Sequence, residues 1–132
     1  MPVSVLLADN SEIVRRAIRE LLQNYAQIKL VGEAANFAQM VQIAKRLKPD
    51  VIVVDLNMLD RAPSDFRSQP SIAECQLIAL SFAFDVDAKL MAASLDISLL
   101  LDKSKLSTEL VPAILKTSSP TTRAGNSAER RE

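Results

Sequence analysis

The sequence predicts an α/β fold, a doubly wound parallel sheet of five strands with helices on both faces. Short, nearly continuous apolar runs, which are typical of strands buried on both faces, alternate with segments whose apolar residues recur at helical spacing. Five strand–helix units in succession favour parallel pairing, because each helix returns the chain to the same edge of the sheet. Polar residues directly follow four of the predicted strands, at the edge where such sheets bind ligands: Asp9, Asp55, Ser81 and Lys103.

The clearest strand lies in the middle of the chain. Residues 50–55 hold an unbroken apolar run between two aspartates, with Pro49 before it and Asp55 at its end. Apolar residues at helical spacing indicate the first helix, from Ser11 to about Asn24, with Asn10 or Ser11 as its N-cap. By the same criteria we predict strands at 3–8, 28–34, 50–55, 76–80 and 97–101, and helices at 11–24, 36–47, 85–94 and 106–116.

Two segments lack a clear pattern. Residues 56–75 contain Pro63, Pro70 and several polar residues, so we expect a loop around one short helix. Residues 118–132 have no apolar periodicity, and we expect a disordered tail or the remnant of a linker there. The predicted organisation is therefore one domain at 1–117 followed by this tail.

Composition excludes several classes of function. The 16 basic and 16 acidic residues cancel, so no net field draws the chain to nucleic acid or to an anionic membrane. The chain has no histidine, which excludes imidazole catalysis, and its 2 glycines cannot build a glycine-rich phosphate loop. The single cysteine, Cys75, cannot form an internal disulfide, and no apolar run has membrane-spanning length. We therefore expect a cytoplasmic protein without direct nucleic-acid or membrane contact.

The polar residues after the strands form a chemically coherent set. If the strand order is 2-1-3-4-5, these residues converge at one edge of the sheet: Asp9, Asn10, Asp55, Ser81 and Lys103. The side-chain oxygens of the first three suit Mg²⁺, which prefers carboxylates, carbonyls and water. The Asp55 carboxylate would be the nucleophile that forms an aspartyl phosphate, while Lys103 and Ser81 bind phosphoryl oxygens. Taken singly, each residue is also explained by a helix cap, a turn or a solvated surface charge.

Four segments carry a resemblance to a known family. They read VLLADNSEIVRR at 5–16, VGEA at 31–34, KPDVIVVDLNM at 48–58 and LLLDK at 99–103. Over residues 3 to 116 the chain resembles the receiver domains of bacterial two-component response regulators, most closely those that precede a helix-turn-helix DNA-binding domain. The resemblance implies a flavodoxin-like fold with strand order 2-1-3-4-5, and Mg²⁺-dependent acceptance of a phosphoryl group from a histidine kinase on Asp55.

The resemblance also implies a role for each residue at the strand ends. Asp9 belongs to the family's metal-binding acidic pair, whose second position is Asn10 here, and the backbone carbonyl of Asn57 is a third metal ligand. Ser81 is the switch hydroxyl and Lys103 the phosphate-binding lysine. A receiver is a signalling domain rather than an enzyme, although it supports its own phosphotransfer and dephosphorylation. It acts on a downstream protein or a fused output domain, and such receivers often form homodimers.

The sequence departs from the family pattern at three places. Asn10 brings a carbonyl oxygen but no charge, so we expect weaker Mg²⁺ binding than a carboxylate would give. After the Asp55 segment, Leu59 and, approximately, Pro63 replace the family's usual proline and glycine, so that loop must take another path. Leu100 replaces an aromatic residue that reorients on phosphorylation in many relatives, and we do not expect that mechanism here.

Three hypotheses about function remain open. The first is a working receiver, and the second is a degenerate receiver that binds proteins without being phosphorylated, which the three departures favour. The third, a phosphohydrolase, needs a second carboxylate beside its nucleophile, and Asp55-Leu56-Asn57 lacks one. Phe82 and Phe84, which follow Ser81, either present apolar surface to a partner or pack in the core.

Overall fold

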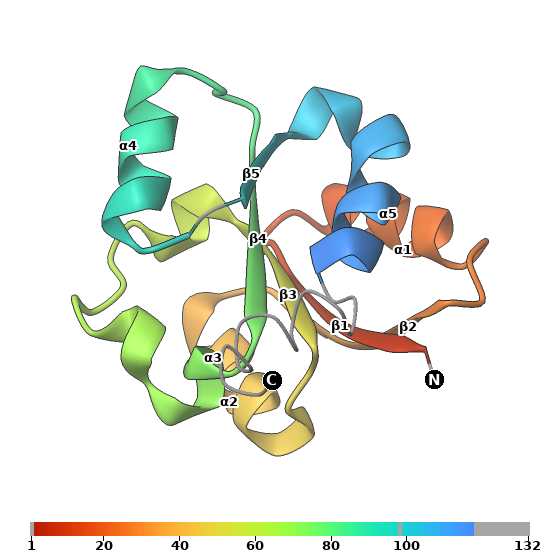
Figure 1. Ribbon diagram of the computed structural model, residues 1–132, viewed down its shortest axis with the longest axis horizontal. Coiled ribbons are helices and arrows are strands. Elements are labelled where there is room, and N and C mark those ends of the chain that lie inside the picture. Colours follow the sequence, from red (N-terminus) through yellow and green to blue (C-terminus); the bar gives the residue numbers. More distant parts are fainter. Residues whose placement is uncertain (1, 98, 118–132) are drawn as a thin grey trace, which may run out of the picture.

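The computed structural model describes residues 2–97 and 99–117. Five parallel strands form one sheet in the order β2-β1-β3-β4-β5, which confirms the predicted fold class (Figure 1). The strands are β1 (Val3–Ala8), β2 (Ile28–Ala34), β3 (Val51–Asp55), β4 (Gln76–Ser81) and β5 (Leu99–Asp102). The α-helices are α1 (Glu12–Leu22), α2 (Phe37–Leu47), α3 (Pro70–Ala73), α4 (Val86–Ser94) and α5 (Leu106–Thr117).

The helices cover both faces of the sheet, and each face has its own apolar core. Ile18 and Leu22 of α1 pack with Leu110 and Ile114 of α5 against one face. Residues of α2, α3 and α4 pack against the other, so the two groups of helices lie on opposite sides of the strands in Figure 1. β3 lies at the centre and all five of its residues are buried, as its unbroken apolar run predicts.

Side-chain caps fix where the helices begin at the sheet edge that carries the polar residues. The Ser11 hydroxyl accepts the Val14 N–H at the start of α1, so Ser11 is the N-cap and Asn10 is free of that role. Asp85 accepts the Ala88 N–H in the same way at the start of α4. These caps set the lengths of the connections that follow β1 and β4.

Two predicted segments differ in the structure. Instead of one short helix, residues 56–75 form two 3₁₀ segments, η1 (Leu56–Leu59) and η2 (Phe66–Ser68), followed by α3. The Phe66 side chain is fully buried, so this loop belongs to the core. β5 begins at Leu99, later than predicted, because the Ile97 N–H bonds the Ala92 carbonyl at 2.9 Å and so closes the end of α4.

The expected tail at 118–132 lies outside the described residues, so its predicted disorder stays a prediction. Within the part of the chain that the structure describes, no helix is long and apolar enough to cross a membrane.

Candidate functional site

Four adjacent strands deliver the polar residues to one edge of the sheet. Asp9 follows β1, Asp55 ends β3, Ser81 ends β4 and Lys103 follows β5. Strand register sets them side by side, since Asp55 lies opposite Leu80 and Ser81 lies opposite Asp102. Asp9, Asp55 and Ser81 are the buried polar residues among those described, with 0%, 7% and 3% of their surface exposed. Buried polar groups of this kind need partners, because burial without them is costly.

The ammonium group of Lys103 joins the two carboxylates. Its Nζ lies 2.7 Å from Asp9 Oδ2 and 3.4 Å from Asp55 Oδ1. The three side chains are 6%, 1% and 9% exposed, so water screens the ion pairs poorly. The interpretation of Lys103 as a solvated surface charge is therefore wrong, and two carboxylates share one cation.

A network on α1 and β2 holds the turn that carries Asp9. The second Asp9 oxygen, Oδ1, accepts the Ser11 N–H at 2.9 Å, and Arg15 Nη1 donates to the Asp9 main-chain carbonyl at 2.6 Å. Glu33 on β2 accepts from Arg15 Nε at 3.2 Å, and Glu12 accepts from Arg15 Nη2 at 2.6 Å. Arg15 is not among the site residues predicted from the sequence, although the spacing of Glu12 and Arg15 is typical of ion pairs along a helix.

The surroundings of Asp55 destabilise the ionised form of its carboxyl group. Burial raises the pKa of the Asp55 carboxyl above its usual range, although the Lys103 charge acts in the opposite direction. The Asn57 N–H donates to Asp55 Oδ1 at 3.3 Å, which gives that oxygen a second partner beside the ammonium. The ionised carboxylate is thus less stable here than in water, and a further cation would stabilise it.

A shallow hollow of about 300 Å³ opens beside Asp55. Its lining includes Asn10 and Asn57, both exposed, and Asn36, the N-cap of α2. The Asn57 carbonyl, one of the expected metal ligands, accepts the Asp60 N–H at 3.2 Å and keeps a second lone pair. Among the described residues, no three acidic, histidine or cysteine side chains gather around a metal position.

The structure brings Asp9, Asp55 and Lys103 together but does not bring the Ser81 hydroxyl to them. Ser81 Oγ donates to the main-chain oxygen of Ala83 at 2.8 Å, within the connection to α4. The side chain is buried at the end of β4, the strand that pairs with β3.

Phe82 contributes an aromatic ring at the site. It lies 69% exposed with its ring centroid 5.2 Å from Lys103 Nζ, and Phe84 is 42% exposed. The interpretation of these two residues as core is therefore wrong. Their position directly after β4 indicated an exposed surface for a partner. It did not indicate the contact of Phe82 with Lys103.

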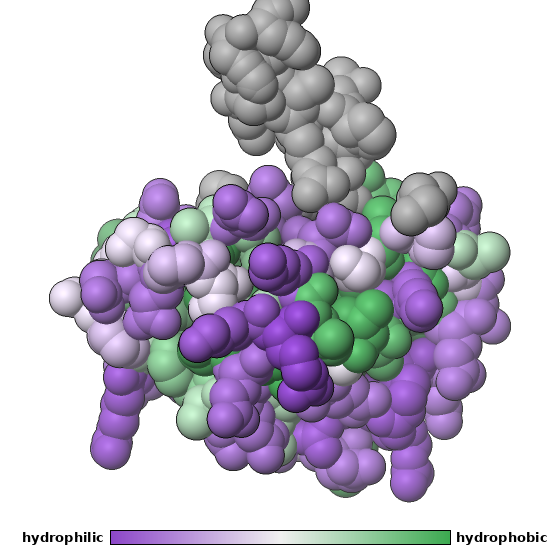
Figure 2. Space-filling view, turned by 90° about the horizontal axis from the view of Figure 1, so that it is seen from below, coloured by the Kyte–Doolittle hydropathy of each residue, from purple (hydrophilic) through white to green (hydrophobic). Residues whose placement is uncertain are grey.

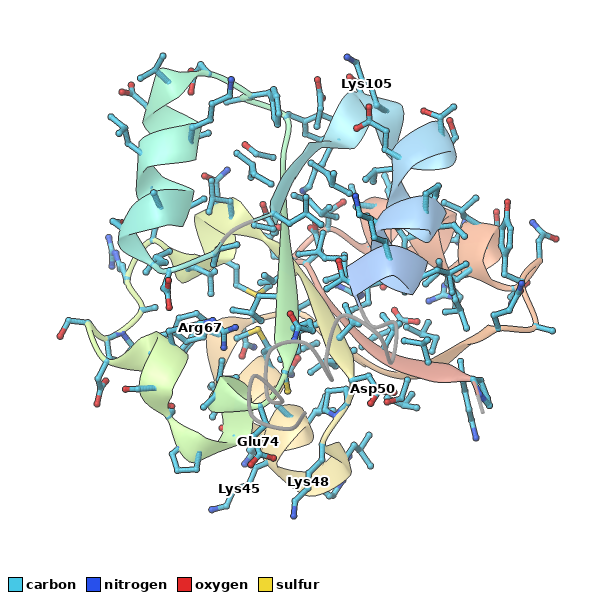
Figure 3. The ribbon with its side chains drawn as sticks, viewed as in Figure 1. Lys45, Lys48, Asp50, Arg67, Glu74 and Lys105 are labelled. Atoms are coloured by element: carbon cyan, nitrogen blue, oxygen red, sulfur yellow. The ribbon has the colours of Figure 1, made fainter. Side chains whose placement is uncertain are left out.

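A second hollow, of about 370 Å³, lies far from this chemistry at the amino ends of the strands. Its lining includes Lys45, Lys48, Asp50 and Glu74, which Figure 3 places at the lower end of the molecule. Lys105, two residues beyond Lys103, lies at the upper end of the same view. Figure 2 shows the molecule from below, and this face is mostly hydrophilic. Charges of both signs line the hollow, so it has no clear ligand preference.

Comparison with known proteins gives the family. Residues 5–115 match the model of the response regulator receiver domain. A region of 58 residues is 45% identical to a protein-glutamate methylesterase/protein-glutamine glutaminase of Alkalilimnicola ehrlichii, and covers 44% of this chain but 15% of that protein. A region of 57 residues is 39% identical to the nitrate/nitrite response regulator protein NarL of Escherichia coli, and covers 43% of this chain and 26% of NarL. The matched regions thus span small parts of longer proteins.

Among solved structures, the signal receiver domain of the putative response regulator NarL from Mycobacterium tuberculosis resembles this chain. The TM-score is 0.79 with 20% sequence identity, over 90% of this chain and 98% of that one. At this identity the likeness concerns the fold. The similar fold agrees with the strand order β2-β1-β3-β4-β5, which places the polar residues at one edge of the sheet.

Proposed function

Because this chain belongs to the response-regulator receiver domain family, we propose that it accepts a phosphoryl group from a histidine kinase on Asp55. One observation carries the assignment of the site: the Lys103 ammonium lies between the buried carboxylates of Asp9 and Asp55. A cation between two carboxylates suits a reaction in which a dianionic phosphoryl group approaches a carboxylate. Such transfer depends mostly on positioning and charge stabilisation.

The hydrogen bonds of Asp55 suggest which oxygen reacts. Oδ1 contacts both Lys103 Nζ and the Asn57 N–H, so we assign the other oxygen, Oδ2, as the nucleophile. Its attack on phosphorus forms the P–O bond while the P–N bond to the kinase imidazole breaks, and the bonding electron pair remains on that nitrogen. Lys103 would then turn from Asp9 toward a phosphoryl oxygen, and the Ser81 hydroxyl would leave the Ala83 carbonyl to donate to another.

The residues around the hollow fit Mg²⁺. Asp55, Asn10 and Asn57 line the hollow and offer a carboxylate, an amide oxygen and a backbone carbonyl. The Asp9 carboxylate, which contacts Lys103 next to Asp55, would add a second carboxylate. Mg²⁺ is usually bound by one or two carboxylates together with phosphate and water. The ion would supply charge neutralisation for the phosphoryl oxygens and for Asp55, whose ionised form burial disfavours. With Asn10 in place of a carboxylate, the two carboxylates and Lys103 sum to one negative charge, so binding would be weak.

The biological role that we propose is that of a signalling domain rather than an enzyme. Phosphorylation would add negative charge beside α4 and β5 and change the affinity for a downstream protein or a fused output domain. We assign residues 1–117 to the receiver and 118–132 to a tail or linker. Neither DNA nor a membrane would contact this chain directly, the setting would be the cytoplasm, and a homodimer is one form in which it could act.

A second candidate is a degenerate receiver that binds a protein without phosphorylation. The observation in its favour is the position of Lys103, whose Nζ lies closer to Asp9, at 2.7 Å, than to Asp55, at 3.4 Å. The Lys103 ammonium contacts both carboxylates and can stabilise the site in place of a metal ion. A site without a metal ion has no need of a carboxylate at position 10, so Asn10 would not weaken it.

Beryllofluoride, a phosphoryl mimic, tests the proposal without a kinase. We expect the backbone amide resonances of Asn57 and Ser104 to shift when beryllofluoride is added in the presence of Mg²⁺, beyond any shift that Mg²⁺ alone causes, and to stay unchanged with beryllofluoride alone. Asp55→Asn should abolish the shifts, whereas Asp60→Asn, which changes an exposed aspartate nearby, should keep them. Shifts that persist in Asp55→Asn, or no shift in the wild type at high Mg²⁺, would contradict phosphoacceptance and favour the degenerate receiver.

A further inference from the structure

The Asn10 side chain lies at the hollow beside Asp55 without a hydrogen bond of its own. It is exposed, and none of the residues that the structure describes bonds its amide group. A side chain without such a bond takes its position from the backbone that carries it, because backbone angles limit the rotamers that it can adopt. The two peptide groups on either side of Asn10 therefore determine where its amide oxygen can lie.

Side chains hold both of these peptide groups. The Asp9 carbonyl, in the peptide group before Asn10, accepts from Arg15 Nη1 at 2.6 Å. The Ser11 N–H, in the peptide group after it, donates to Asp9 Oδ1 at 2.9 Å. The Asp9 N–H donates to the Ala34 carbonyl of β2 at 3.0 Å. Because Arg15 belongs to α1, this helix fixes the orientation of the peptide group that leads into Asn10.

Arg15 can hold the Asp9 carbonyl firmly because its own guanidinium is fixed. The Arg15 side chain is 13% exposed, and two glutamates accept from its other nitrogens. Nε donates to Glu33 at 3.2 Å and Nη2 donates to Glu12 at 2.6 Å, so Nη1 is directed at the carbonyl. A planar guanidinium presents its donors in a rigid fork, whereas an ammonium group on a flexible stem does not.

The charges around Arg15 allow positioning to be told apart from electrostatics. The ion pairs join two arginines and two glutamates, whose charges cancel: Arg15, Arg19, Glu12 and Glu33. Loss of either arginine leaves a net negative charge, which by attraction alone would strengthen Mg²⁺ binding. Arg19 Nη1 donates to Glu33 at 2.6 Å, and no hydrogen bond of the described residues joins Arg19 to Asp9. Arg19 is therefore the matched control for the charge of Arg15.

We propose that Arg15 is a positioning residue for the magnesium site, because it holds the Asn10 amide oxygen at the hollow through the Asp9 carbonyl; this rests on the proposed function. An amide oxygen has no charge with which to attract the ion from a distance. Mg²⁺ also demands near-ideal octahedral geometry, so the contribution of Asn10 depends on where its oxygen lies. Arg15 limits the loss of affinity that follows from an amide at this position.

A double-mutant cycle tests whether Arg15 acts through Asn10. Titration of backbone amide resonances with Mg²⁺ gives the affinity of wild type, Arg15→Met, Asn10→Ala and the combined variant. We expect Arg15→Met to weaken binding by about threefold or more, the effect of one hydrogen bond, and to cause no loss where Asn10 is already alanine. Arg19→Met should bind Mg²⁺ at least as tightly as wild type. Unchanged or tighter binding by Arg15→Met, or an equal loss in the Asn10→Ala background, would overturn the proposal.

The side-chain amide resonances of Asn10 give a second readout in the metal-free protein. Arg15→Met should shift them and Arg19→Met should not, while urea unfolding shows whether each variant is folded. If Arg15→Met does not fold, Arg15→Lys replaces it with the same expectation, because lysine keeps the charge without the planar fork. Resonances that do not respond to the loss of Arg15 would contradict the positioning. If wild type neither binds Mg²⁺ nor accepts a phosphoryl group, the proposed function fails, and these resonances alone decide whether Arg15 positions Asn10.

Discussion

Lys103→Met is expected to lower the free energy of unfolding by about 3–5 kcal/mol in metal-free buffer. The methionine keeps the length of the side chain but removes the cation that lies 2.7 Å from Asp9 and 3.4 Å from Asp55. Asp9 is fully buried, so its carboxylate would lose its ionic partner where water cannot reach it. Urea unfolding followed by circular dichroism measures the change.

Two variants identify the cause of the loss. Lys105→Met removes an exposed lysine two residues away and should stay within about 0.5 kcal/mol of wild type. Asp9→Asn combined with Lys103→Met removes both members of the closest pair and should recover part of the lost stability, because a neutral amide is easier to bury than an unpaired carboxylate. A Lys103→Met protein as stable as wild type would contradict the buried ion pair.

Asn10→Asp is expected to raise the affinity for Mg²⁺ by about tenfold or more. Asn10 lines the hollow beside Asp55, so the substitution adds a third carboxylate to a site that has two. The same charge should lower stability in metal-free buffer, because it lies near two carboxylates that share one ammonium. Isothermal titration calorimetry with Mg²⁺ measures the affinity, and unfolding with and without Mg²⁺ measures the opposite effects on stability.

Asn24→Asp is the matched control for this prediction. It makes the same chemical change at an exposed position after α1, away from the hollow, and should leave Mg²⁺ affinity unaltered. If Asn10→Asp and Asn24→Asp bind Mg²⁺ equally, the ion does not bind beside Asp55 and the assignment of the metal ligands is wrong.

The architecture was predictable because it depends on patterns that local sequence contains. The apolar run before Asp55 indicates a strand buried on both faces, and alternation with helices requires parallel pairing. Asp9, Asp55 and Lys103 could be placed at one edge because the carboxyl ends of parallel strands share it. In the structure, Lys103 Nζ lies 2.7 Å from Asp9 Oδ2 and 3.4 Å from Asp55 Oδ1. The roles of the three residues stay proposals.

Other features depend on contacts that no local pattern contains. The Ser81 hydroxyl bonds the Ala83 carbonyl because of the rotamer that the side chain adopts, which the sequence does not specify. The contact of the Phe82 ring with Lys103 joins residues that follow two different strands, β4 and β5. The loop after Asp55 was predicted poorly because its helical segments, of three or four residues, are shorter than the window in which periodicity is visible. Phe66 fixes that loop against the core because its side chain is fully buried, and this burial has no signature in the periodicity of the sequence.

The central claim is that Asp55 accepts a phosphoryl group. Intact-mass analysis after incubation with acetyl phosphate tests it most directly, with wild type and Asp55→Asn compared in the presence and absence of Mg²⁺. We expect one phosphoryl adduct in the wild type that requires Mg²⁺ and is absent from Asp55→Asn. No adduct in the wild type even at high Mg²⁺, or an adduct of equal yield in Asp55→Asn, would contradict the account.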